Sequence, residues 1–135
     1  MCPEQTYASG NPRPASARHM SVKTCGVDEF QQRLKEWRGG PASFNAYRDD
    51  HDRLILKLAH PMAQQEPVGL AFFYCTYVAG PTSWHAADLV VREAAREDGS
   101  LGYEACDSVA GLVVRFASAS LYGHEEAVLP ERNSK

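Results

Sequence analysis

The sequence predicts an α+β domain in which an N-terminal helix packs on a four- to five-stranded antiparallel meander sheet. Apolar residues recur at helical spacing in one early segment, and from Arg53 onward they alternate with polar residues, as in strands. The breaks between the expected strands are too short for crossover helices, which favours antiparallel neighbours. A sheet that curls into a barrel is the alternative.

The helix is expected within residues 28–39. Its apolar stripe, spaced i, i+4 and i+7, consists of Phe30, Leu34 and Trp37. We expect Asp28 to be the N-cap, Gln31 to be its capping-box partner, and Gly39 to end the helix in the left-handed conformation. A further helical turn or two is expected within residues 41–52.

Five strands are expected after the helix, and they span residues 53–60, 68–79, 84–93, 103–107 and 111–122. The second and third should pair as a hairpin around the turn 80–83. One face of this sheet gathers apolar side chains, which the helix stripe should cover. That predicted core consists of Leu54, Leu56, Leu58, Val68, Leu70, Phe72, Tyr74, Val78, Ala87, Leu89, Val91, Leu112, Val114 and Phe116.

The domain itself is predicted to span residues 25–123. Residues 1–24 contain three prolines and almost no aliphatic side chains, so we expect a flexible tail there, and residues 124–135 read as a charged C-terminal tail. No apolar run is long enough to cross a bilayer and no hydrophobic signal stretch is present, so we expect a cytoplasmic protein without membrane contact.

The four cysteines are expected to be free thiols. They stand at positions 2, 25, 75 and 106, and no two of them have the C-x-x-C spacing of a structural zinc site. A chain of 135 residues with an ordinary apolar content has little need of disulfides.

The most suggestive catalytic constellation is Cys75, His85 and Asp88. A thiol nucleophile needs its base within about 3 Å. The expected hairpin places Cys75 opposite Asp88, with His85 roughly 10 Å along the ladder and on the other face of the sheet. We therefore predict that these residues form no catalytic group.

Other chemistry-bearing residues give no stronger signal. The RDDHD stretch, residues 48–52, could offer ligands to a cation, but neighbouring side chains point in different directions and we interpret it as a solvated turn. His60 and His124 read as polar residues at strand ends. No nucleotide-binding, zinc-protease or serine-hydrolase motif is present. We expect no enzyme activity, no metal and no cofactor.

The face opposite the predicted core mixes large aromatics with isolated charges. Aromatic residues and arginine are the residue types that most often anchor interfaces. The candidate partner-binding residues are Lys57, Phe73, Tyr77, Trp84, Asp88, Arg92 and Arg115. The sequence thus predicts a non-catalytic interaction protein of the inhibitor, immunity or adaptor type, which uses this face on a protein partner or on itself as a homodimer.

Two other functions use the same face. In the first, a curled sheet encloses a small-molecule or active-site cavity lined by Phe73, Tyr77, Trp84 and Asp88, where burial would raise the pKa of the aspartate. In the second, single-stranded nucleic acid stacks on the aromatic rings. The net charge of −3 and the pI near 5.9 argue against nucleic acid. A face covered by other parts of the chain would have none of these roles.

Overall fold

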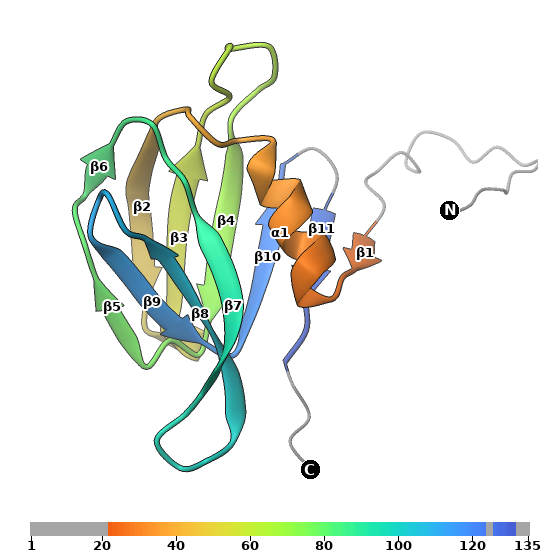
Figure 1. Ribbon diagram of the computed structural model, residues 1–135, viewed down its shortest axis with the longest axis vertical. Helices are drawn as coiled ribbons and strands as arrows, with labels where there is room; N and C mark the ends of the chain where they lie inside the picture. Colours follow the sequence, from red (N-terminus) through yellow and green to blue (C-terminus); the bar gives the residue numbers. More distant parts are fainter. Residues whose placement is uncertain (1–21, 124–125, 132–135) are drawn as a thin grey trace, which may run out of the picture.

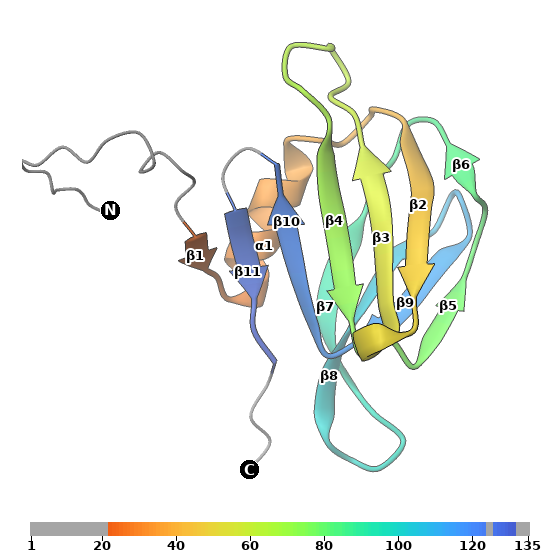
Figure 2. The same cartoon turned by 180° about the vertical axis from the view of Figure 1, so that it is seen from behind.

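Two sheets stacked face to face, with one helix beside them, make up the computed structural model, which describes residues 22–123 and 126–131 (Figure 1, Figure 2). Nearly all neighbouring strands are antiparallel, and the pair β1–β11 is parallel. The predicted α+β class with antiparallel sheets is confirmed. The single meander of four or five strands is wrong, and both sheets are open rather than closed into a barrel.

The larger sheet has seven strands in the order β1–β11–β10–β4–β3–β2–β6. These strands are β1 (Val22–Thr24), β11 (Glu126–Leu129), β10 (Ser118–Tyr122), β4 (Val68–Phe73), β3 (Arg53–Leu58), β2 (Ala42–Arg48) and β6 (Ser83–Trp84). The smaller sheet has four strands in the order β5–β9–β8–β7. These are β5 (Tyr77–Ala79), β9 (Leu112–Phe116), β8 (Leu101–Asp107) and β7 (Val90–Ala95).

The helix α1 (Val27–Lys35) packs beside β7, the edge strand of the smaller sheet, and against β11 of the larger sheet (Figure 1). Its predicted stripe is confirmed as core: Phe30, Leu34 and Trp37 are all buried. Gly39 has the expected positive φ, 91°, but it does not end the helix, which stops at Lys35 with Glu36 as its C-cap. The predicted capping box is wrong, because the N-cap is Gly26 and makes no side-chain cap.

The segment 41–52, expected to add a helical turn or two, instead forms β2 and a short 3-10 turn, Asp50–Asp52. β2 pairs antiparallel with β3, and the register shifts between Phe44 and Ala46. This bulge breaks the period-two alternation, so the apolar pattern of the segment does not look like that of a strand.

Two of the expected long strands change sheets halfway along. The segment 68–79 divides into β4 and β5, and the segment 111–122 divides into β9 and β10. The two segments remain partners through the change, since β4 pairs with β10 in one sheet and β5 pairs with β9 in the other. The positive φ of Tyr74, 57°, makes the bend in the first segment.

This change of sheet breaks the predicted hairpin of 68–79 with 84–93. The next segment divides too: β6 pairs with β2, whereas β7 pairs with β8. Cys75 therefore does not lie opposite Asp88 in any ladder. The predicted core is otherwise correct, because all of its members are buried except Tyr74 and Val78, which are 44% and 42% exposed.

Strands also form within the two predicted tails. β11 pairs with β10 and buries Ala127 and Leu129, so its alternation of apolar residues belongs to the core. β1 then adds to the far side of β11. The tail segments 1–21, 124–125 and 132–135 lie outside the described residues.

Candidate functional site

The seven predicted partner-binding residues do not share one face. Lys57 and Phe73 lie on the outer face of the seven-stranded sheet, where the Arg53 guanidinium carbon sits 6.0 Å from the centre of the Phe73 ring. Trp84 belongs to β6, the edge strand of the same sheet, and the remaining four lie on the smaller sheet or in the loop before β7. The prediction of a single patch is wrong because it assumed one sheet where the chain forms two.

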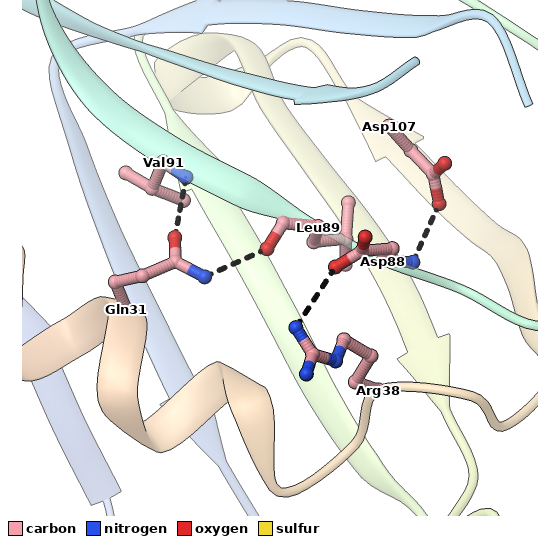
Figure 3. Close-up of polar contacts among 6 residues, drawn as sticks. All are labelled: Gln31, Arg38, Asp88, Leu89, Val91 and Asp107. Carbon is pink, nitrogen blue, oxygen red and sulfur yellow. Dashed lines mark hydrogen bonds and ion pairs between the residues drawn. The ribbon is translucent and has the colours of Figure 1, made fainter. Parts of the chain in front are cut away.

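Trp84 and Asp88 meet at a buried carboxylate, that of Asp107, which is 1% exposed. One oxygen of Asp107 accepts hydrogen bonds from Trp84 Nε1 at 2.9 Å and from the backbone N–H of Asp88 at 2.8 Å. The other oxygen accepts from the backbone N–H of Ala110 at 3.3 Å. The Asp88 side chain points to Arg38, 3.9 Å away (Figure 3). This cluster ties β6 and the loop before β7 to the end of β8, which is a structural role.

Tyr77, Arg92 and Arg115 do come together, in a row across the outer face of the smaller sheet. The row runs Tyr77–Arg115–Glu104–Arg92, each residue directly opposite the next on the neighbouring strand. Glu104 accepts from Arg92 at 2.5 Å and from Arg115 at 3.2 Å. The hydrogen bond from Arg92, with that from Arg115, holds the pKa of Glu104 below its usual value. The Arg115 guanidinium also lies over the Tyr77 ring, 5.3 Å from its centre.

A lateral opening lies between the two sheets, and it is lined by residues of β2, β3, β5, β9 and the turn between β5 and β6. It forms because the chain leaves the smaller sheet after β5 and joins the larger sheet at β6, so that β5 and β2 separate. A cavity of about 210 Å³ lies there. Its apolar lining comes from both sheets and includes Phe44, Leu54, Leu56, Val78 and Leu112.

Exposed apolar side chains occur on the strands that flank this opening, and two of them, Phe44 and Val78, line it. Ten large apolar side chains are exposed in the described part of the chain, and five of them belong to the two strands that flank the opening or to the bend between β4 and β5. We call these five the aromatic rim: Phe44 (45% exposed), Tyr47 (47%), Tyr74 (44%), Tyr77 (49%) and Val78 (42%). The sequence pointed to Tyr77 alone among them as a binding residue.

An unusual backbone joins the turn after β2 to the bend between β4 and β5. His51, Asp52 and Tyr74 all have positive φ, at 62°, 44° and 57°. Backbone hydrogen bonds hold them together: the N–H of Tyr74 donates to the carbonyl of His51 at 2.6 Å, and that of Cys75 donates to Asp52 at 3.0 Å. Such conformations persist only where the surroundings enforce them. Here they fix the position of the rim residue Tyr74.

Cys75 lies behind this turn and has the wrong properties for a nucleophile. Its Sγ donates to the carbonyl of Phe72 at 3.6 Å. Burial raises the pKa of the thiol to about 11. A thiol nucleophile needs a lowered pKa instead.

The remaining candidate chemistry is sparse. No three His, Cys, Asp or Glu side chains of the described residues gather where they could hold a metal ion. No helix in residues 22–123 or 126–131 is long and apolar enough to span a bilayer. Two larger cavities, of about 480 and 330 Å³, lie beside α1 and beside the β7–β8 hairpin. Neither contains Phe73, Trp84 or Asp88, so neither is the predicted enclosed site.

Comparison with family models, with curated proteins and with solved structures gave no significant match.

Proposed function

We propose that this protein is a non-catalytic binding protein that recognises a polypeptide, from a partner protein or a second copy of itself, through the lateral opening and its aromatic rim. The observation that carries the proposal is an apolar opening lined by the exposed Phe44 and Val78, with the other exposed rim side chains on the same strands or on the bend before β5. Contiguous exposed apolar patches on soluble proteins usually mark contact surfaces. Tyrosine, which supplies three of the five rim residues, is enriched in interfaces.

The chemistry of the opening supports binding rather than catalysis. Its lining is mostly apolar and includes no acid, base or thiol. Its cavity of about 210 Å³ is smaller than the roughly 300 Å³ at which ordinary small-molecule sites begin. An apolar side chain of a partner fits such a space better than a metabolite does.

The Tyr77–Arg115 pair extends the contact surface beyond the opening. Tyr77 belongs to the rim and to the charged row on the outer face of the smaller sheet. Tyr77 and Arg115 face away from the side of β5 on which Val78 lines the cavity, so a partner in the opening meets them by reaching around this edge strand. Arg115 is 54% exposed. Arg and Tyr together at the centre of a contact are the usual composition of energetic hot spots.

The test compares capture by three baits from a lysate of the native host, with quantitative mass spectrometry as the measurement. The baits are the native protein, Val78→Asp and Met62→Asp. Val78 lines the cavity, whereas Met62 is 68% exposed in the β3–β4 loop and does not. We expect the native and Met62→Asp baits to capture a protein that the Val78→Asp bait does not capture. If the partner is a second copy, sedimentation should instead show a dimer for the first two proteins and a monomer for Val78→Asp. Capture and sedimentation that are equal for all three baits would refute the proposal.

A further inference from the structure

We infer that the occupant of the lateral opening is an extended segment of a partner protein that adds as a strand to the free edge of β2. The segment places one apolar side chain in the cavity and directs a lysine or arginine toward Asp49 and Asp52. This inference rests on the proposed function and specifies how the binding occurs.

The first support is the unpaired edge of β2. The short strand β6 pairs with Ala42 and Ser43, and Thr82 accepts from the N–H of Phe44 at 2.7 Å. Beyond that point, no strand among the described residues pairs with residues 45–48 on this side, since β5 pairs with β9 in the other sheet. An open edge presents backbone donors and acceptors to another chain.

The second support is the position of the cavity beside that edge. Phe44 of β2 and Val78 of β5 flank it, and Leu54 and Leu56 of β3 contribute to its lining. An apolar cavity of about 150 Å³ accepts a benzene molecule, so about 210 Å³ accepts one large apolar side chain. Strand addition generally combines main-chain hydrogen bonds with a pocket for alternate side chains, and the opening offers both.

The third support is charge, and it identifies the partner as basic. Asp49, Asp50 and Asp52 stand at the end of β2. Asp50 is neutralised by Arg53 at 3.1 Å, whereas no ion pair joins Asp49 or Asp52 to a cation of the described residues. Desolvation, followed by the nearby charges that include Asp52 and Asp49, raises the pKa of the Tyr47 phenol at the same end.

The neighbouring cations do not cancel this acidic end. Arg48 lies directly opposite Arg53 in the β2–β3 ladder, and this pair is next to the pair formed by Tyr47 and Leu54. Successive side chains of a strand point to opposite faces, so Arg48 lies on the outer face of the sheet while Tyr47 lies on the face of the opening. Arg115 is engaged with Glu104. A basic side chain at the end of the incoming strand therefore meets complementary charge.

The probe that tests this inference is a phage-displayed library of random peptides of about twelve residues, panned on the full chain. We expect enrichment of sequences that alternate apolar and polar residues and carry Lys or Arg beside the apolar run. The consensus peptide should bind Met62→Asp as it binds the native protein. It should bind Val78→Asp at least about tenfold more weakly, the scale expected for a central interface side chain.

Two further measurements isolate the strand and the charge. N-methylation of the peptide backbone at alternate positions should abolish binding in one register, because each methyl group removes an edge hydrogen bond. Asp49→Lys should weaken binding of the basic peptide and strengthen binding of a peptide in which Glu replaces the basic residue. Asp49 makes no side-chain cap hydrogen bond to the 3-10 turn, so the exchange should leave the fold intact.

Several results would overturn the inference. They are enrichment of acidic, proline-rich or helical peptides, N-methylation without effect in either register, and a dimer that Val78→Asp dissociates. In each case the capture experiment remains a separate readout. If the native bait captures a partner that Val78→Asp does not, and N-methylation of the peptide leaves its binding unchanged, only strand addition is refuted. Capture that ignores Val78→Asp would refute the binding function itself.

Discussion

The backbone N–H of Val91 donates a hydrogen bond of 2.6 Å to Oε1 of Gln31 (Figure 3). The other half of the same amide, Nε2, donates to the carbonyl of Leu89 at 2.9 Å. β7 is the edge strand of the smaller sheet. The Gln31 side chain thus offers it a donor and an acceptor, as a neighbouring strand would. This contact joins the helix to the sheet and covers an edge that would otherwise invite pairing.

We predict that Gln31→Ala lowers the free energy of unfolding by about 1–3 kcal/mol, because it leaves a part-buried donor and acceptor without partners. Urea unfolding followed by circular dichroism measures the change. Gln32→Ala is the matched control, since Gln32 is exposed on the same helix. Equal midpoints for the two variants would show that the amide bridge contributes nothing.

We predict that Asp107→Asn destabilises the fold by about 2 kcal/mol. The amide group of asparagine cannot accept all three of the hydrogen bonds that the buried carboxylate accepts, two of them at one oxygen. The loss should be accompanied by a weaker near-ultraviolet circular dichroism signal from Trp84. Asp88→Asn, which removes only the exposed contact with Arg38, should cost less than about 1 kcal/mol. A smaller loss for Asp107→Asn than for Asp88→Asn would contradict this ranking.

The alternation of apolar residues predicts which residues are buried, but not which sheet they enter. Leu70 and Phe72 belong to one sheet and Val78 to the other, yet all three stand in one uninterrupted pattern. A strand that bends between packed sheets keeps its inward side chains inward on both sides of the bend. The decisive residue is Tyr74, whose positive φ makes the turn, and tyrosine carries no sequence signal for that conformation.

The candidate site was harder to predict for the same reason. The bulge after Phe44 breaks the alternation of apolar residues, so the sequence did not predict the strand that carries Phe44 and Tyr47. These two residues flank the opening because β5 pairs in the other sheet and not with β2. The charged row was partly predictable, since Arg92 follows the buried Val91 and Arg115 stands between the buried Val114 and Phe116. Glu104, which holds Arg92 and Arg115 together, could be identified only from the register of β8.

The Cys75 thiol should react slowly with alkylating reagents in the folded protein. Because its pKa is raised to about 11, the folded chain holds little thiolate at pH 8. Iodoacetamide should therefore alkylate Cys75 in the folded protein about a hundredfold more slowly than in the urea-unfolded chain, as peptide mass spectrometry can measure. Rapid alkylation in the folded state would restore the cysteine as a candidate nucleophile.

The same shift has a consequence for stability with a definite sign. Between the ordinary thiol pKa of roughly 8.5 and about 11, the unfolded chain releases the Cys75 proton more readily than the folded chain does. The free energy of unfolding should therefore fall as pH rises through this window. Other groups titrate there as well, so the measurement is the difference in urea midpoint between the native protein and Cys75→Ala at pH 7, 9 and 10. As pH rises, the urea midpoint of the native protein should fall relative to that of Cys75→Ala. A constant difference would mean that the thiol is not desolvated.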